Sequence, residues 1–204
     1  MFTFREPSNN LLEPRHVSNF LSKEEIQTIF NNLKTISFEQ GQTDSNEKYN
    51  LRSSQVKWIP FSKEWEWLYG KLYFLISQVN NDFFKLNLND INENIQYTEY
   101  SYEYKGEYGW HTDVGTQYPP SHRKISVTIQ ISDPSEYEGG HLQLFSSKYN
   151  ENAEQEGIPP FLQNSPKALG TATIFPSFIP HRVTPIVKGI RKSLVLWVGG
   201  TPFR

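Results

Sequence analysis

Three residues with metal-binding side chains stand out in this sequence. His111 and Asp113 are separated by one residue, and His181 follows far downstream. Two imidazoles and one carboxylate can hold a metal on one face and leave other positions open, which is the ligand set of mononuclear non-haem Fe(II) oxygenases. Arg191 lies shortly after His181, where a guanidinium could pair with a carboxylate of a bound co-substrate. Together the four residues predict metal-dependent chemistry with an acidic co-substrate.

The spacing of the ligands has a mechanical reason. Residues i and i+2 of an extended strand project from the same face, so His111 and Asp113 can bind one ion together. Gly106 and Gly109 suit a chain that bends before these ligands, and His181 must come from a distant strand. A His-x-Asp pair also occurs by chance, however, and a histidine after a proline is usually a surface residue. Spacing alone therefore leaves a purely structural role open.

The sequence contains three further histidines. We expect His16, which lies before the first helix, and His122, which lies in a Pro-rich loop, to be solvated or locally hydrogen-bonded. His141 follows the Gly139-Gly140 turn on an expected strand, and we favour a structural role for it over a place in the cavity.

Bulk properties narrow the class of protein. A length of 204 residues with 15% aromatic residues suits one domain with a full core, and we expect a single domain over 1–204. The absence of cysteine excludes disulfides, thiolate metal ligands and cysteine nucleophiles. A formal net charge of -2 gives no basic footprint for nucleic acid. The first residues lack the apolar core of a signal peptide and no run is long enough to span a bilayer, so a cytoplasmic protein without a membrane partner is expected.

Two helices are expected in an N-terminal part covering about 18–85. Ser22 and Glu25 form a capping-box pattern, after which apolar residues recur at helical spacing. A second apolar stripe predicts a helix over 63–80. Residues 39–54 are polar and are expected to form a loop.

From about residue 94 the pattern changes to strands. Residues 124–132 alternate strictly, with Ile125, Val127 and Ile129 on one face and Thr128 and Gln130 on the other. Further strands are expected over 95–104, 140–145, 171–175 and 192–198. Residues 146–168 are polar and long for a structureless loop, so they are expected to be disordered or a lid. Helices followed by strands indicate an α+β, mainly β fold with helices on one side of an antiparallel sheet.

An ordered series of motifs resembles the 2-oxoglutarate- and Fe(II)-dependent dioxygenases, in particular their prolyl-4-hydroxylase-like branch. The resemblance covers most of the chain and is strongest from about 97 to 200. No single block is specific, but their order is. The blocks are Tyr102-Glu103-Tyr104-Lys105-Gly106-Glu107-Tyr108-Gly109-Trp110-His111-Thr112-Asp113, then Arg123-Lys124-Ile125-Ser126-Val127, Gly139-Gly140-His141-Leu142, and His181-Arg182-Val183 followed by Gly189-Ile190-Arg191.

The resemblance implies a double-stranded β-helix, or jelly roll, over about 94–200. His111, Asp113 and His181 would bind Fe(II), and Arg191 would pair with the C5 carboxylate of 2-oxoglutarate, with O2 as second co-substrate and ascorbate as an auxiliary reductant. Ser193 shares a strand face with Arg191 and could donate to the same carboxylate. By family position, the remaining candidates for the co-substrate pocket are Tyr102, Gln130 and Leu142, with Tyr108 weaker.

The polar strand faces support such a pocket independently. Two strands that are otherwise expected to be central in the sheet carry polar residues on one face, namely Thr128 and Gln130 on one strand and Arg191 and Ser193 on the other. Polar groups buried in a barrel must be hydrogen-bonded or charge-paired, and a bound dicarboxylate would satisfy them. The alternative is that these faces are solvated. Trp197, on the same face as Arg191, is expected in the core.

The resemblance implies hydroxylation of a C–H bond, with a prolyl residue of a peptide or protein as the favoured substrate. Loops at 39–54, 113–123 and 146–168 could close over an extended peptide, and Tyr108, Trp110 and Tyr118 could stack on a proline ring. A free amino acid or another small metabolite is the alternative substrate. Nucleobase demethylation is disfavoured by the missing basic stripe.

Two other classes of function remain open from the sequence. A zinc hydrolase also uses three N or O ligands plus water, and it needs a general-base glutamate, for which Glu107 is the close candidate. A non-catalytic jelly-roll binding module would be expected to have lost a metal ligand or the arginine, and all four residues are present here.

Overall fold

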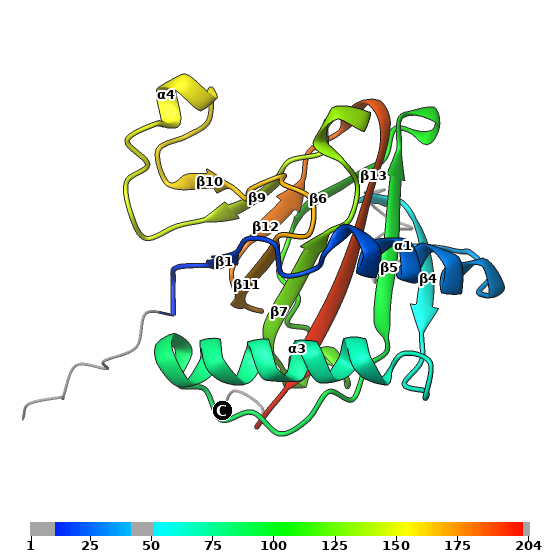
Figure 1. Ribbon diagram of the computed structural model, residues 1–204. Helices are drawn as coiled ribbons and strands as arrows, with labels where there is room; N and C mark the ends of the chain where they lie inside the picture. Colours follow the sequence, from blue (N-terminus) through cyan, green and yellow to red (C-terminus); the bar gives the residue numbers. More distant parts are fainter. Residues whose placement is uncertain (1–10, 42–50, 202–204) are drawn as a thin grey trace, which may run out of the picture.

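Two antiparallel sheets form the body of the protein, shown as a computed structural model in Figure 1. The structure describes residues 11–41 and 51–201. The larger sheet has the order β1-β11-β7-β13-β5-β4-β2, with β8 also paired to β13, and the smaller has the order β10-β9-β12-β6-β3. The strands of the larger sheet are β1 (Arg15–Val17), β11 (Ala172–Pro176), β7 (Arg123–Gln130), β13 (Ile186–Gly199), β5 (Ile95–Ser101), β4 (Gln55–Ile59), β2 (Glu39–Gln40) and β8 (Tyr137–Gly139). The smaller sheet consists of β10 (Leu162–Asn164), β9 (Leu142–Phe145), β12 (His181–Val183), β6 (Glu107–His111) and β3 (Arg52–Ser53). Two facing antiparallel sheets agree with the predicted jelly roll.

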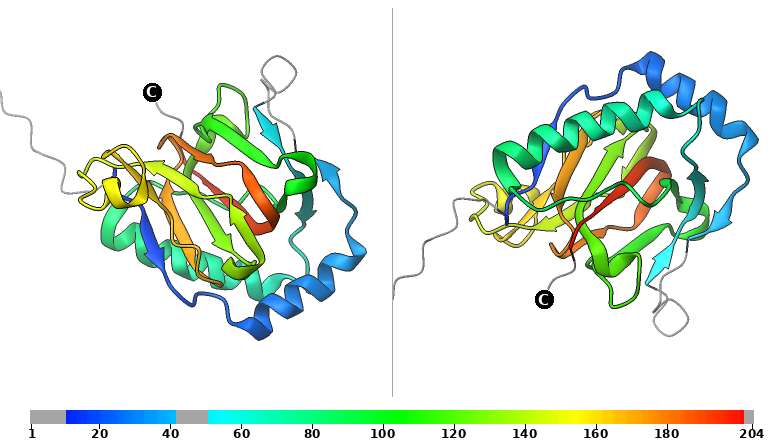
Figure 2. Two further views of the ribbon diagram at one scale, coloured as in Figure 1. Left: turned by 90° about the horizontal axis from the view of Figure 1, so that it is seen from above. Right: turned by 90° about the horizontal axis from the view of Figure 1, so that it is seen from below.

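Helix α1 (Lys23–Asn32) begins at the predicted capping box. The Glu25 backbone N–H donates to the Ser22 hydroxyl at 3.2 Å, and the Ser22 N–H donates to the Glu25 carboxylate at 2.8 Å. These two bonds satisfy orphan donors of the first turn and fix where the helix starts. Together α1 and α3 (Glu66–Val79) cover the outer face of the larger sheet, as the helix-then-strand pattern predicts (Figure 2).

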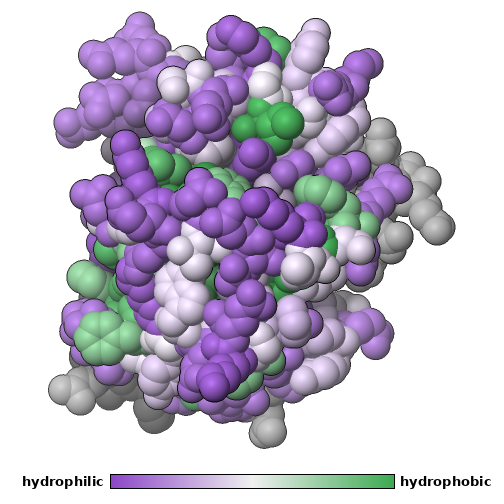
Figure 3. Space-filling model, turned by 45° about the vertical axis from the view of Figure 1, so that its right-hand side comes forward, coloured by the Kyte–Doolittle hydropathy of each residue, from purple (hydrophilic) through white to green (hydrophobic). Residues whose placement is uncertain are grey.

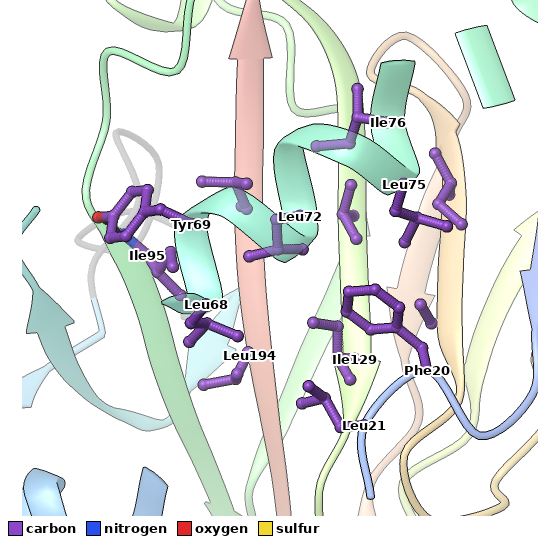
Figure 4. Packing of buried hydrophobic residues seen from close by; sticks show 14 of the residues in the cluster. Phe20, Leu21, Leu68, Tyr69, Leu72, Leu75, Ile76, Ile95, Ile129 and Leu194 are labelled. Atoms are coloured by element: carbon purple, nitrogen blue, oxygen red, sulfur yellow. Dashed lines mark hydrogen bonds between the residues drawn. The ribbon is translucent and has the colours of Figure 1, made fainter. Parts of the chain in front are cut away.

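Helix α3 buries its apolar stripe on the larger sheet. Leu68 and Leu72 of the helix lie over Ile129 of β7 and Leu194 of β13 (Figure 4). The helix starts three residues later than predicted and continues into a π-helical turn over Asn80–Phe84. The alternation along β7 is confirmed, because Ile125, Val127 and Ile129 all belong to this core while the alternate residues face the other sheet.

Leu72→Ala is expected to destabilise the fold by about 2–5 kcal/mol, since Leu72 is fully buried and alanine leaves a cavity. Urea unfolding followed by circular dichroism measures this change, and the midpoint should fall with an unchanged slope. Tyr73→Ala on the same helix is the matched control, because Tyr73 is 66% exposed and its loss should cost little. Equal losses for both variants would contradict this account of the core.

Three expectations about elements are corrected by the structure. Residues 146–168 contain α4 (Ala153–Glu156) and β10, which pairs with β9, so the segment is an ordered excursion of the smaller sheet. Strand β13 begins at Ile186, which puts Arg191 inside the strand and not at its start. The polar stretch 39–54 contains β2 and β3, and its residues 42–50 lie outside the described part, as do the first ten residues considered for a signal peptide.

Gly189 lies where β13 changes its pairing partners. Its φ is +71°, and a Cβ there would lie 2.0 Å from the carbonyl oxygen of Glu136. Only glycine fits such a position without strain. The strand pairs with β8 before this point and with β5 and β7 after it.

Hydrophilic side chains cover most of the face seen in Figure 3, and hydrophobic ones form small separate areas. No helix within 11–41 and 51–201 has the length and apolar character to cross a bilayer.

Candidate metal centre and co-substrate cavity

The three predicted ligands come together between the two sheets. His111 ends β6 and His181 begins β12, and the two residues face each other directly in the antiparallel register. Asp113 lies just beyond β6, where its backbone N–H donates to the carbonyl of Ser177 at 2.9 Å. One ligand atom from each of the three residues lies within 4.8 Å of the others. Strand pairing therefore brings together residues that are 70 positions apart.

Both imidazoles are oriented by the same local device. His111 Nδ1 lies 2.8 Å from the carbonyl oxygen of Gly109, and His181 Nδ1 lies 2.9 Å from that of Ile179. A carbonyl only accepts, so Nδ1 carries a proton in each ring and Nε2 is the nitrogen left to bind a metal. His111 Nε2 lies 3.7 Å from Asp113 Oδ1, and His181 Nε2 lies 3.5 Å from Asp113 Oδ2. The ligand atoms of all three residues thus converge on one point.

The carboxylate of Asp113 has its own supporting hydrogen bonds. The Ser126 hydroxyl donates to Asp113 Oδ2 at 2.6 Å, and Ser126 in turn lies 3.0 Å from the hydroxyl of Ser177. Both serines are fully buried. Outer partners of this kind fix a ligand's orientation and tune a metal site.

The protonation states suit a cation. Burial lowers the pKa of His111, with the neighbouring His181 as the next cause, so the ring is neutral near neutral pH. Burial raises the pKa of Asp113, but His181, His111, Arg123 and the Ser126 hydrogen bond outweigh it and hold that pKa below its usual range. Neutral imidazoles and an ionised carboxylate are the forms that bind metal.

Ser126→Ala is expected to weaken Fe(II) or Mn(II) binding by roughly 10–100-fold while the fold is kept. The alanine removes the hydroxyl that holds Asp113 Oδ2. Competition with a chromophoric chelator measures the affinity. Ser177→Ala is the control and should have a smaller effect, because the Ser177 hydroxyl reaches the Asp113 carboxylate only through Ser126. An unchanged affinity in Ser126→Ala would contradict the positioning role.

A cavity of about 700 Å³ opens from these ligands between the sheets. Its walls combine charged, polar and aromatic side chains from both sheets. They include Arg52, Trp58, Gln96, Tyr100, Tyr108, Val114, Arg123, Thr128, Leu142, Arg191, Ser193 and Trp197. The metal-binding group therefore shares one cavity with Arg191.

Arg191 is the most deeply buried cation in this cavity, at 3% exposure. Its guanidinium donates to the Ser193 hydroxyl at 3.2 Å and lies 5.6 Å from the centre of the Tyr100 ring. Within the described ranges no carboxylate lies at ion-pair distance from it. Burial lowers the pKa of Arg191, yet an arginine stays charged in proteins. A buried cation with only neutral protein partners fits a site for an anionic ligand.

The other predicted pocket residues differ in where they lie. Leu142, Ser193 and Tyr108 line the cavity, and the Tyr108 ring stacks on His111 with 3.5 Å between ring centres. Gln130 lines a smaller side cavity next to Arg191. Tyr102 does not line either cavity and is 59% exposed.

Tyr100 takes the place expected for Tyr102. Strand β5 ends at Ser101, and Tyr102 opens a 3-10 turn over Tyr102–Tyr104, so the strand alternation does not reach it. Counting by twos from Gln96 would have found Tyr100, which is inward-facing and 4% exposed. Arg52 and Trp58, which also line the cavity, gave no signal in the sequence.

Several aromatic residues lie elsewhere than expected. Trp110 is on the outer face of the smaller sheet, with the Arg182 guanidinium 4.9 Å from its ring, and Tyr118 is 64% exposed. Neither lines the cavity. Trp197 is buried as predicted, but it lines the cavity and lies under the guanidinium of Arg123 at 3.8 Å.

The remaining histidines and the candidate glutamate stay outside the metal-binding group. His16 contacts the Thr173 hydroxyl, and His122 contacts that of Ser121. The backbone N–H of His141 donates to the Thr184 hydroxyl, and His141 does not line the cavity. Glu107 pairs with Ser53 of β3 and does not line the cavity either, so the glutamate considered as a hydrolase general base is not at this site.

The predicted loops contribute unequally to the cavity. Val114, Gly115 and Pro120 from 113–123 line it, and so do Glu39 and Leu51 from 39–54. No residue of 146–168 lines it, so that excursion is not a lid over the metal-binding group.

Comparisons with known proteins agree with this geometry. The sequence profile of the 2OG-Fe(II) oxygenase superfamily matches residues 95–199. A PKHD-type hydroxylase from Acidovorax ebreus (strain TPSY) is 33% identical over 99 residues, which cover 46% of this chain and 38% of that protein. A second, from Paraburkholderia xenovorans (strain LB400), is 31% identical over 101 residues, covering 48% and 39%. The matched part thus spans well under half the length of these relatives.

Solved structures share the fold over nearly the whole chain. A prolyl-4-hydroxylase from Pseudomonas putida superposes with a TM-score of 0.66 at 17% identity, covering 92% of each chain. A prolyl hydroxylase from Trichoplax adhaerens, in complex with a hypoxia inducible factor peptide fragment, gives a TM-score of 0.70 at 20% identity, covering 92% of this chain and 83% of that one. Superfamily members use Fe(II), 2-oxoglutarate and O2. With a profile match over half its length and a jelly roll around a His-Asp-His group, this chain belongs to the 2OG-Fe(II) oxygenase superfamily and is prolyl-hydroxylase-like.

Proposed function

We propose that the chain is a hydroxylase in which His111, Asp113 and His181 hold Fe(II) and Arg191 pairs with the C5 carboxylate of 2-oxoglutarate. One observation carries this proposal. A convergent His-Asp-His group shares a cavity of about 700 Å³ with a buried arginine that has no ion-pair partner among the described side chains. We also infer that 11–201 acts as one catalytic domain, because both helices pack on the sheet that carries Arg191.

The residues of the chain would divide the work as follows. The two imidazoles and the Asp113 carboxylate present three ligand atoms and leave the cavity side open for other ligands. Arg191 meets a carboxylate through its planar fork, and Ser193 adds a hydroxyl beside it. Bound Fe(II), with 2-oxoglutarate and O2, supplies the oxidation that hydroxylates a C–H bond.

A prolyl residue in a peptide or protein is the proposed substrate. Support comes from the likeness to a Trichoplax adhaerens prolyl hydroxylase whose structure holds a peptide fragment. The cavity also extends beyond the metal-binding group to Glu39 and Arg52 from the 39–54 stretch and to Pro120, which gives room for a substrate longer than one small molecule. A free amino acid or another small metabolite is the alternative substrate.

Mass spectrometry of product separates these substrates. Fe(II)-loaded protein with 2-oxoglutarate and ascorbate is incubated with a library of proline-containing peptides, and separately with free amino acids. We expect addition of one oxygen to a prolyl residue of a peptide, coupled to succinate formation. Oxygen addition to free amino acids alone would overturn the peptide assignment, and succinate formation without metal would overturn the metal assignment.

A further inference from the structure

A second, much smaller cavity adjoins the main one behind Arg191. It measures about 10 Å³, room for about one water-sized atom. Arg191, Thr128 and Leu142 line both cavities, so the two are neighbours. Lys167 and Thr171 line only the smaller one. An oxygen atom held by Arg191 can therefore lie within reach of residues that the main cavity does not include.

Lys167 brings a second positive charge to this place. It comes from the segment between β10 and β11, and its ammonium donates to the carbonyl of Gly139 at 3.0 Å and lies 4.1 Å from the centre of the Tyr137 ring. Burial lowers the pKa of Lys167, and the charge of Arg191 lowers it further. In the part of the chain that the structure describes, no carboxylate lies at ion-pair distance from Lys167, and the nearby Glu138 pairs with Lys188 instead. Two cations thus border one cavity without a protein anion between them.

The hydrogen bonds among the side chains behind Arg191 leave a hydroxyl group that can still donate its proton. The Ser132 hydroxyl donates to the carbonyl of Lys192, so it must accept from Gln130, whose amide nitrogen faces it at 3.2 Å. That same nitrogen donates to the Tyr137 hydroxyl at 2.7 Å. Because its oxygen accepts this hydrogen bond, the Tyr137 hydroxyl keeps its own proton for another acceptor.

An unpartnered hydroxyl on the wall of the side cavity points to the same kind of ligand. Thr171 is 2% exposed, and its Oγ1 has no hydrogen-bond partner among the described residues. Buried polar atoms are normally satisfied by protein, water or ligand. A negatively charged oxygen next to Arg191 would give Thr171 and Lys167 a common acceptor.

We propose that Lys167 is a second cation of the co-substrate site, binding the C5 carboxylate of 2-oxoglutarate jointly with Arg191. The proposal rests on the proposed function. An ammonium has three donors, so Lys167 can keep its bond to Gly139 while it donates to a ligand. The ordered excursion 146–168 then has a role: its last residues carry a charge to the closed end of the co-substrate site.

Calorimetry on Mn(II)-loaded protein under anaerobic conditions tests this without turnover. Two ligands are compared: 2-oxoglutarate, and 2-oxopentanoate, which has a methyl group in place of the C5 carboxylate. We expect Lys167→Met to weaken 2-oxoglutarate binding by about 10–100-fold, as for loss of a hydrogen bond to a charged group. Binding of 2-oxopentanoate should change by less than about twofold, within the usual scatter for an uncoupled site. Lys148→Met, on the same excursion but 68% exposed, should change neither.

Each outcome decides the matter. Equal weakening of both ligands in Lys167→Met would mean that the lysine only supports the fold, and unchanged binding of 2-oxoglutarate would mean that it does not reach the carboxylate. Either result overturns the Lys167 assignment and leaves the proposed function standing. If unmodified, Mn(II)-loaded protein binds neither ligand, the proposed function fails and the Lys167 assignment fails with it.

Discussion

His181→Ala is expected to leave no measurable hydroxylation, a loss of at least about three orders of magnitude. Removing an outer partner of a metal ligand typically costs roughly 10–100-fold, and removing the ligand itself should cost more. Asp113 would remain buried beside Ser126, facing His111 alone. The fold should survive with a cost of about 1 kcal/mol, the typical value for a point substitution. Succinate release and bound iron are measured together.

His122→Ala is the matched control for this variant. His122 lies in a 3-10 turn over Pro120–His122 and does not line the cavity, so its loss removes an imidazole without touching the metal-binding group. Turnover and iron content should both stay unchanged. Full activity in His181→Ala, with iron still bound, would show that His181 is not a ligand.

Arg191→Met is expected to raise the dissociation constant for 2-oxoglutarate by roughly 10²–10³-fold. Breaking a buried ion pair by removing one partner costs about 3–5 kcal/mol, and each 1.4 kcal/mol is about tenfold in affinity. Methionine keeps most of the side-chain volume, so packing against Tyr100 is largely retained. Arg191→Lys should recover only part of the affinity, because an ammonium cannot form the planar two-bond pair. Calorimetry with metal-loaded protein measures both variants.

Arg182→Met supplies the control. Arg182 lies next to His181 on β12 but projects from the outer face, where its Nε donates to Gln143 at 2.8 Å. Its loss removes one positive charge near the site without entering the cavity. The pocket assignment is wrong if Arg182→Met and Arg191→Met weaken 2-oxoglutarate binding to the same extent.

Local periodicity explains what the sequence could predict. The capping box at Ser22, the stripe of the second helix and the alternation along 124–132 depend on neighbours a few residues away, and all three are confirmed. The His111-x-Asp113 pair is similarly local. The inward polar face of Thr128 and Ser193 also followed from alternation, and both side chains line the cavity.

What escaped prediction depends on breaks in those patterns or on long-range pairing. Tyr102 was expected in the pocket by family position, but β5 ends at Ser101 and a 3-10 turn begins at Tyr102, so Tyr100 lines the cavity instead. Short strands such as β10 and β12 have three residues each, too few for a periodic signal, and they form through pairing with distant strands. Lys167 sits in a polar stretch whose composition gave no reason to place it beside Arg191, and only the pairing of β10 with β9 brings it there.

Anaerobic titration of the Fe(II)-loaded protein with 2-oxoglutarate, followed by visible absorption, tests the central claim most directly. Chelation of iron by the keto acid should produce a weak metal-to-ligand charge-transfer band that saturates with 2-oxoglutarate. The band should be absent in His181→Ala and should need far more 2-oxoglutarate in Arg191→Met. Bound iron that gives no band with 2-oxoglutarate in the unmodified protein would contradict the account.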